Sequence, residues 1–367
     1  MKVLVYHIGQ LGDTIVSIPA LRAVRRYFGH TTRISMLHDS TGRLVTAEMV
    51  LDGSALVDEF IPYSPEKGAG KLKTVAKLWR RLRRERFDAV VSLLPSDRSP
   101  RALLRDRLFF RACGISRLIG FRPYAESEIR PRHISGRPAR TPNEASLRLR
   151  RLFAEGIAMG SADFFAPPLL SVSREREAAI GRWLKHRRKH PLRPLIALCP
   201  GCKKRANSWP ANRFLEIARR LIELDRFEVV ILGGPAERDL THMMVDALDS
   251  RAIHAAGCFT VMESAALLSR CSLLIGLDTG TTHLAAAVGV PCVVIQSANS
   301  FPGQWDPLGD GHLVIRAEGP CDGCQMQTCP VAGQPCMRDI TVDRVWSAME
   351  TALLETEYER HATHSHA

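Results

Sequence analysis

A short polar segment, Asp278 to His283 (DTGTTH), directly follows the apolar run from Leu273 to Leu277 and precedes an alanine-rich stretch. The pattern predicts a strand that ends in a hydroxyl-rich turn at the N-terminus of a helix. Such a helix start offers free backbone N–H groups and the positive end of the helix dipole, and both favour a bound anion. The segment is therefore a candidate phosphate-binding site.

A similar strand–loop–helix pattern opens the chain, where KVLVYHI is followed by Gly9, Gly12 and Asp13. Two glycines at this spacing form only part of a dinucleotide fingerprint, and no acidic residue ends a second strand at the usual distance, which argues against a nicotinamide cofactor. Asp13 has two possible roles. Its carboxylate could cap the helix start, or it could act as a general base, because the loop after the first parallel strand faces the ligand.

Three consecutive cations, Lys203, Lys204 and Arg205, lie between a predicted strand and a predicted helix. This position suits a diphosphate, and a solvated basic loop is the simpler alternative. The next strand is followed by GGPAE, whose glycines let a ligand approach the backbone. Glu237 ends this motif and could bind ribose hydroxyls or merely favour a helix N-terminus.

Alternating strands and helices position these segments. Strands are predicted at 2–8, 33–38, 57–63, 87–94 and 117–121 in the first half, and at 194–201, 227–235, 251–257, 273–278 and 290–296 in the second. Predicted helices lie at 15–28, 71–87, 143–157, 212–225, 236–248, 262–270 and 341–359. This order predicts an α/β fold with parallel sheets. Because ligands bind outside the carboxyl ends of such strands, we expect two Rossmann-like domains that face a central cleft.

The Pro-containing segment 163–173 is the candidate linker between these domains. The N-terminal domain is predicted to span residues 1–170 and the C-terminal domain residues 171–345. The end of the C-terminal helix (346–360) and a disordered tail (361–367) follow. Residues 123–142 show no periodicity and are predicted to form a loop.

The chain has 367 residues and a formal net charge of +13, which calls for a polyanionic partner. A membrane surface or a phosphorylated substrate fits better than nucleic acid, because the aromatic content is only 6% and no groove-reading module is recognisable. No apolar run approaches the length of a membrane span, and the N-terminus does not have the layout of a signal peptide. We therefore expect a cytoplasmic protein, without a disulfide framework.

The chain resembles the ADP-heptose:lipopolysaccharide heptosyltransferases, glycosyltransferase family 9. The resemblance covers nearly the whole chain and rests on GQLGDTIVSIPALRAVRRYF, FDAVVSLL with the following Arg98-Ser99, PG…SWP, LGGPAE and LDTGTTHLAAAVGVP. It implies the two-lobed GT-B arrangement. It also implies an inverting transfer of heptose from ADP-heptose to the inner core of lipopolysaccharide, without a metal or another cofactor.

The resemblance also implies the roles of individual residues. Asp13 would be the base that deprotonates the acceptor hydroxyl, the backbone from Gly9 to Gly12 would border the transferred sugar, and Glu237 would bind the ribose. The donor's diphosphate and sugar would contact Asp278, Thr279, Gly280, Thr281 and His283. The family usually has a lysine two residues before the Trp-Pro pair, where this chain has Asn207. One of the cations Lys203, Lys204 and Arg205 must then neutralise the diphosphate.

The acceptor implied by the resemblance is an acidic, phosphorylated saccharide on a lipid anchor. Cations on loops of the N-terminal half are candidates for binding it: Arg98, Arg101, Arg122, Arg130 and Arg132. The helix predicted at 71–87 is strongly basic, with an apolar stripe of Leu72, Val75, Trp79 and Leu82. This helix either packs its stripe and solvates its charges, or contacts anionic headgroups at the inner face of the inner membrane.

Four cysteines cluster late in the sequence: Cys321, Cys324, Cys329 and Cys336. Zinc sites usually have two short pairs that are well separated, and this spacing is irregular. Two interpretations stay open, a metal that staples a loop away from the chemistry, or reduced structural thiols.

Three other functions stay open at this point. The chain could use another nucleotide sugar within the same family. It could be a nucleotide-dependent oxidoreductase or epimerase, although the missing fingerprint counts against this. It could also bind a nucleotide sugar without turnover, although Asp13 counts against that.

Overall fold

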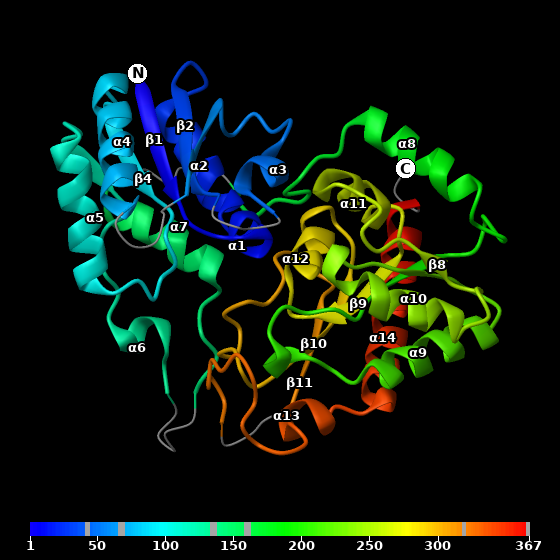
Figure 1. Ribbon diagram of the computed structural model, residues 1–367. Coiled ribbons are helices and arrows are strands. Elements are labelled where there is room, and N and C mark those ends of the chain that lie inside the picture. The colour runs from blue at the N-terminus through cyan, green and yellow to red at the C-terminus, as the bar shows by residue number, and fades with distance from the viewer. Residues whose placement is uncertain (41–44, 65–69, 133–137, 158–162, 318–320, 365–367) are drawn as a thin grey trace. The chain divides into compact units, whose positions relative to one another are not determined.

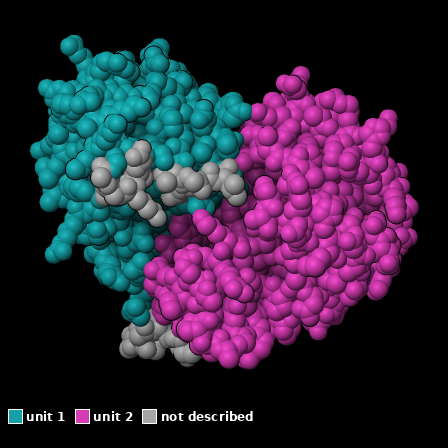
Figure 2. All heavy atoms as spheres, viewed as in Figure 1, with its two compact units in different colours: residues 1–132, 141–166 teal, residues 133–140, 167–367 magenta. Residues whose placement is uncertain are grey.

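The computed structural model describes residues 1–40, 45–64, 70–132, 138–157, 163–317 and 321–364. The chain forms two compact units, which Figure 2 distinguishes by colour. One unit, the N-terminal domain, comprises residues 1–132 and 141–166, and the other, the C-terminal domain, comprises residues 133–140 and 167–367. The last crossing from the N-terminal to the C-terminal domain lies between Ala166 and Pro167, within the segment 163–173.

The N-terminal domain contains a five-stranded parallel sheet in the order β3-β2-β1-β4-β5. Figure 1 labels its three middle strands, β2, β1 and β4. Its strands are β1 (Lys2–His7), β2 (Arg33–Asp39), β3 (Glu59–Tyr63), β4 (Ala89–Ser92) and β5 (Arg117–Ile119). Side chains of β1 alternate between two buried faces, Leu4 and Tyr6 on one and Val3 and Val5 on the other. Burial on both faces explains why the central strands read as continuous apolar runs.

Seven helices accompany this sheet in the described ranges: α1 (Leu11–Ile15), α2 (Ile18–Phe28), α3 (Ala47–Leu51), α4 (Gly70–Glu85), α5 (Pro100–Ala112), α6 (Glu126–Ile129) and α7 (Glu144–Ala154). Helices α4 and α5 cover one face, where Leu82 and Phe110 pack with Leu4 and Tyr6. Helix α7 packs against α2.

The C-terminal domain contains a six-stranded parallel sheet in the order β11-β10-β9-β6-β7-β8. Its strands are β6 (Leu195–Cys199), β7 (Glu228–Ile231), β8 (Ile253–His254), β9 (Leu273–Leu277), β10 (Cys292–Gln296) and β11 (Leu313–Arg316). The sequence patterns did not predict β11. It is a short edge strand that is only partly buried, so its hydrophobic signal is weak.

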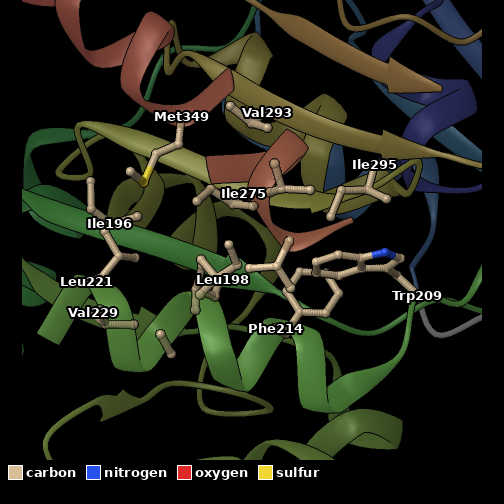
Figure 3. Packing of buried hydrophobic residues seen from close by; sticks show 14 of the residues in the cluster. Ile196, Leu198, Trp209, Phe214, Leu221, Val229, Ile275, Val293, Ile295 and Met349 are labelled. Atoms are coloured by element: carbon tan, nitrogen blue, oxygen red, sulfur yellow. The ribbon is translucent and has the colours of Figure 1, made fainter. Parts of the chain in front are cut away.

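The helices of this domain are α8 (Arg174–Lys185), α9 (Ala211–Glu223), α10 (Arg238–Asp246), α11 (Val261–Leu268), α12 (Gly280–Ala287), α13 (Pro335–Arg338) and α14 (Val342–His364), with 3-10 turns η1 (Arg205–Asn207) and η2 (Pro235–Glu237). Figure 3 shows the core on one sheet face, where α9 and α14 contribute Phe214 and Met349. Trp209 packs edge-to-face on Phe214, with ring centroids 5.0 Å apart. This contact fixes the end of the basic loop that follows β6.

Several predicted elements need correction. The helix predicted at 15–28 is two helices, because the chain turns at Ser17, whose N–H bonds to the Thr14 carbonyl at 3.1 Å. The disordered tail predicted at 361–367 is wrong for residues 361–364, which continue α14. No glycine or proline interrupts the helix there. Residues 365–367 lie outside the described residues, as do 133–137 of the predicted loop, which also contains α6.

Within the described ranges, every helix is too short or too polar to cross a lipid bilayer.

Candidate functional site

Each sheet has a position where the strand order reverses, and open α/β sheets usually bind ligands there. In the N-terminal sheet this position lies between β1 and β4, which pair in parallel with Tyr6 opposite Ser92. The loops that follow these two strands therefore lie side by side. They carry residues 9–13 and 96–98, so the sheet brings two of the sequence motifs together.

Asp13 is the third residue of α1, and its carboxylate has contacts on both oxygens. Oδ2 accepts a hydrogen bond from the Gln10 backbone N–H at 3.0 Å, and Oδ1 lies 3.4 Å from Nη2 of Arg148. The first contact stabilises the helix start, so the capping role is present. The Asp13 side chain is still 28% exposed and therefore accessible to a ligand. A Cβ at Gly9 would lie 2.2 Å from the Asp13 Cβ, so only glycine leaves room there.

A buried ion-pair network lies behind Asp13. The Arg148 side chain is fully buried, and Nη1 donates hydrogen bonds to the Asp13 backbone carbonyl at 2.8 Å and to the Ser17 hydroxyl. Nε of Arg148 donates to Glu144 at 3.0 Å. Glu144 accepts hydrogen bonds from the Ser96 backbone N–H at 2.8 Å and from its hydroxyl at 2.7 Å. The network thus joins the loops after β1 and β4 through α7.

Sequence reasoning predicted α7 but missed this network. Glu144 and Arg148 are four residues apart and lie on the buried face of the helix, together with Leu147 and Leu152. Charged residues at positions where the periodicity expects apolar ones were the available signal. Arg151 is a third such residue, and burial lowers the pKa of its guanidinium.

The five predicted acceptor arginines are dispersed over the N-terminal domain. Arg98 and Arg130 lie closest to the loop after β4, and each is paired with an acid. Nη2 of Arg98 lies 3.5 Å from Asp106, and Nη2 of Arg130 lies 3.5 Å from Asp97. These two arginines are therefore positioned by ion pairs near the Asp13 edge of the sheet.

The other three arginines have different surroundings. Arg101 belongs to α5, so its predicted position on a loop is wrong. Arg122 follows β5, and its backbone N–H donates a hydrogen bond to Glu155. Arg132 is exposed.

In the C-terminal sheet the strand order reverses between β6 and β9, which pair with Cys199 opposite Gly276. The loop after β6 carries residues 200–210, and β9 leads directly into residues 278–283. Both donor motifs identified in the sequence therefore lie at one edge of this sheet.

Asp278 ends β9, and its side chain is only 11% exposed. One carboxylate oxygen accepts hydrogen bonds from the Ser300 hydroxyl at 3.1 Å and from Nε2 of Gln296 at 3.5 Å, and the other lies 3.9 Å from Nε2 of His283. Burial raises the pKa of the Asp278 carboxyl to about 6, against the opposing effect of the two hydrogen bonds. The carboxyl therefore carries a proton at mildly acidic pH.

Thr279 is the N-cap residue of α12, and its backbone is extended. Its hydroxyl oxygen is buried and has no hydrogen-bond partner in the part of the chain that the structure describes. Gly280 and Thr281 form the first turn of the helix, where backbone N–H groups have no intrahelical acceptor. An unsatisfied buried hydroxyl beside such N–H groups fits a ligand phosphate. His283 is buried and packs edge-on against Trp305.

The three cations of the basic loop are not equivalent. Lys204 is partly buried, and its charge lies close enough to Asp278 to act to lower the pKa of that carboxyl. Lys203 and Arg205 are exposed. Lys204 is therefore the cation best placed beside the start of α12.

Asn207 is buried and already has partners. Its Oδ1 accepts hydrogen bonds from the Ser297 hydroxyl and from Nδ2 of Asn299, both at 2.9 Å. Asn207 thus ties the basic loop to the segment after β10.

Glu237 lies between the loops after β6 and β7. Its Oε2 accepts a hydrogen bond from the Gly234 backbone N–H at 2.7 Å, so it stabilises a helix start, as the simpler interpretation expected. A Cβ at Gly201 would lie 2.2 Å from the Glu237 Cγ, so the side chain packs directly on the backbone of the basic loop.

The cysteines Cys321, Cys324, Cys329 and Cys336 are free thiols. Burial, together with the other three thiols, raises the pKa of Cys336, so each of the three lies close enough to Cys336 to act on it. Among the described residues, no group of three or more His, Cys, Asp or Glu side chains has the arrangement of a metal site. The structure gives the metal interpretation no support.

The family model of glycosyltransferase family 9 (heptosyltransferase) matches residues 75–334. The chain belongs to this family. The predicted family is thereby confirmed, and the matched segment of the family 9 chain contains Glu144, Arg148 and the whole donor edge of the C-terminal sheet.

Curated relatives of this family 9 chain align over shorter segments. The chain is 26% identical over 170 residues to lipopolysaccharide heptosyltransferase 2 of Escherichia coli, which covers 45% of this chain and 48% of the relative. It is 30% identical over 129 residues to the protein of the same name from Salmonella typhimurium, covering 34% of this chain and 36% of the relative. The chain therefore spans about half or less of the length of these relatives.

Solved structures match nearly the whole chain. A glycosyltransferase of family 9 from Veillonella parvula has a TM-score of 0.73 at 20% identity, covering 96% of this chain and 97% of that one. The Escherichia coli ADP-heptose lipopolysaccharide heptosyltransferase II has a TM-score of 0.70 at 22% identity, covering 97% and 100%. An Escherichia coli heptosyltransferase determined with ADP has a TM-score of 0.63 at 15% identity, covering 96% and 100%.

These matches show the fold. The predicted fold class, two Rossmann-like parallel-sheet domains of the GT-B type, is confirmed. The cleft that the sequence analysis expects between the domains stays a prediction.

Proposed function

We propose that this family 9 chain transfers a heptose from ADP-heptose to the inner core of lipopolysaccharide, with inversion at the anomeric carbon. The observation that carries the proposal is the Asp13 carboxylate, which is 28% exposed and held from behind by the buried Arg148. A general base must be accessible to the acceptor and fixed in orientation. Asp13 meets both requirements at the reversal point of its sheet.

The donor would bind at the reversal point of the C-terminal sheet. The first turn of α12 and the unsatisfied Thr279 hydroxyl would hold the diphosphate, with Lys204 as the neutralising cation. Glu237 would bind the ribose. Burial raises the pKa of Asp278 to about 6, so its carboxyl is protonated more readily than an ordinary aspartate, and protonation would reduce charge repulsion with the sugar phosphate. A fold relative determined with ADP supports the choice of nucleotide.

The proposed reaction uses groups that the chain itself provides. The acceptor hydroxyl attacks the anomeric carbon, its oxygen forms the new glycosidic bond, and its proton passes to the Asp13 carboxylate. The bond between the anomeric carbon and the diphosphate oxygen breaks, and ADP leaves with the electron pair. Lys204 and the N–H groups at the start of α12 stabilise the charge that develops on the leaving diphosphate. We therefore propose that the transfer reaction requires no metal ion.

The acceptor would be a lipid-anchored, anionic saccharide. Arg98 and Arg130, which ion pairs position near the Asp13 edge, are the candidates for binding its acidic groups, with Arg101, Arg122 and Arg132 farther out. A lipid anchor places the acceptor in a bilayer. We therefore propose that the protein works at the inner face of the inner membrane.

A matrix of donors and acceptors tests this function. Purified protein would be incubated with ADP-heptose, other ADP-sugars and UDP-sugars, each with and without core saccharide and with excess EDTA. We expect release of ADP from ADP-heptose only with the acceptor, undiminished by EDTA. Preference for another nucleotide sugar, epimerisation without an acceptor, binding without turnover or loss of activity with EDTA would each contradict the proposal.

A further inference from the structure

One face of α5 has an unusual composition for a surface that is exposed to water. Leu104 and Leu108 lie one turn apart and are 57% and 58% exposed. All the exposed positions around them between 101 and 111 are arginines: Arg101, Arg105, Arg107 and Arg111. We call these six residues the α5 face.

Packing of the N-terminal domain does not account for the α5 face. The helix is anchored by its opposite side, where Leu103, Asp106 and Phe110 are buried. Arg105 forms an ion pair with Asp106. Within the described ranges, Arg101, Arg107 and Arg111 have no acidic partner. Two exposed leucines surrounded by arginines are therefore left available to a partner.

Helix α4 extends this surface with further positive charge. The two helices are adjacent in Figure 1, and Trp79 and Arg83 of α4 both donate hydrogen bonds to the Ala112 carbonyl at the end of α5, at 2.9 and 3.3 Å. Exposed cations line the outer side of α4: Lys73, Lys77, Arg80, Arg83 and Arg84.

The apolar stripe of α4 is mostly unavailable. Leu82 is buried in the core, together with Leu78, and Trp79 packs against them. Of the four residues predicted for the stripe, only Leu72 is largely exposed, at 80%. α4 therefore packs most of its stripe, as the first of the two interpretations expected, and headgroup contact by its charges stays a prediction. On this surface α4 provides charge, and α5 provides the exposed apolar side chains.

We propose that the α5 face, together with the outer side of α4, docks on an anionic lipid bilayer. Leu104 and Leu108 insert among the acyl chains near the headgroups, and the arginines around them extend their charged ends to lipid phosphates. Aliphatic side chains at the centre favour a bilayer over nucleic acid, which would be contacted by aromatic or hydrogen-bonding groups. The α5 face stands on its own observations, and only its link to a membrane-held acceptor rests on the proposed function.

Vesicle sedimentation tests this inference. The full chain would be mixed with vesicles of phosphatidylcholine alone and with vesicles that contain phosphatidylglycerol. We expect binding only to the anionic vesicles, and Leu104→Ser/Leu108→Ser should weaken it about 10-fold, since two partly inserted leucines are lost. Leu192→Ser is the matched control, because this leucine is fully exposed in the C-terminal domain. Arg107→Gln/Arg111→Gln should weaken binding and reduce its dependence on salt.

Two further measurements separate the possible failures. Unchanged thermal unfolding of the leucine variant would show that its fold is intact. Transfer to a soluble, delipidated acceptor should keep its wild-type rate, while transfer to vesicle-held acceptor should fall. Equal vesicle binding by wild type and leucine variant would overturn the inference, as would preferential binding to RNA. Absence of transfer to every acceptor would contradict the proposed function and leave the vesicle result to decide on docking.

Discussion

Arg148 reaches Asp13 from inside the N-terminal domain, with Nη2 at 3.4 Å from the carboxylate and Nη1 at 2.8 Å from the backbone carbonyl of the same residue. The guanidinium thus fixes both the side chain and the peptide unit of Asp13. Its own buried charge is balanced by Glu144, at 3.0 Å. A planar group with several donors can make all of these contacts at once, whereas a lysine can supply only one charged point.

Replacement of Arg148 by lysine should therefore slow the transfer reaction without weakening the binding of the donor. We expect kcat to fall by about 10- to 100-fold, because a small displacement of the base is costly, while the KM for ADP-heptose stays unchanged. Arg150→Lys, at an exposed position of the same helix, is the control.

A second comparison separates the effect on catalysis from the effect on stability. Arg148→Met alone leaves Glu144 buried without its partner, at a cost of about 3–5 kcal/mol, and Glu144→Gln/Arg148→Met should recover that stability but not kcat. Wild-type kcat in the stable double variant would reject the positioning role.

Asp13→Ala should abolish transfer while ADP affinity, measured by calorimetry, stays near normal. The loss in kcat should be at least about 100-fold, since a general base typically contributes that much. Asp88→Asn is a suitable control, because this carboxylate bonds to the backbone of Lys2 at the opposite end of β1. Normal turnover of Asp13→Ala would show that another group accepts the proton.

Neutralising Lys204 should weaken the binding of ADP far more than the binding of adenosine. Because Lys204 is partly buried and its charge acts on Asp278, whereas Lys203 and Arg205 are exposed, Lys204→Met should raise the Kd for ADP by about 10-fold or more. The matched variants Lys203→Met and Arg205→Met should have smaller effects, and the triple variant should show the largest loss. If all three single variants lose ADP and adenosine affinity equally, the diphosphate is not held by this loop.

Asp278 should make stability depend on pH in a direction opposite to that of a salt-bridged carboxylate. Its folded pKa of about 6 exceeds the ordinary value of 3.8, so the folded state keeps the proton longer than the unfolded chain. The contribution of Asp278 to the free energy of unfolding is therefore largest below about pH 4 and falls by about 3 kcal/mol as the pH rises past 6. Denaturant unfolding of wild type and Asp278→Asn across this range measures the effect. The asparagine variant should lose less stability as the pH rises, and parallel curves would contradict the buried, proton-holding carboxyl.

The sequence predicted the elements that have an unambiguous hydrophobic pattern, either a continuous apolar run or a clear helical period. β1, β4, β6 and β9 are buried on both faces, so their apolar runs were unambiguous. The sequence did not predict α5. Its buried positions include Asp106 and its exposed positions include Leu104 and Leu108, so its hydrophobic periodicity is weak. α8 buries only Ile180 and Leu184 and gave too little signal.

The site was predictable in the same uneven way. The motifs around Asp13 and Asp278 are local, and the parallel order of the strands was enough to place them at sheet edges. The partners of these motifs come from distant parts of the chain. Arg148 lies 135 positions from Asp13, and Asn299 lies 92 positions from Asn207. A single sequence carries no information on such pairings beyond the oddity of a buried charge.

Asn207 illustrates how one exchange constrains its surroundings. Its side-chain oxygen is an acceptor for two donors, Ser297 and Asn299. A lysine ammonium has no acceptor to offer them. Asn207→Lys, which introduces the residue that the resemblance leads us to expect at this position, would therefore set three donors against one another in a buried space. The asparagine is therefore matched to its two partners, and a lysine at this position would require a different lining after β10.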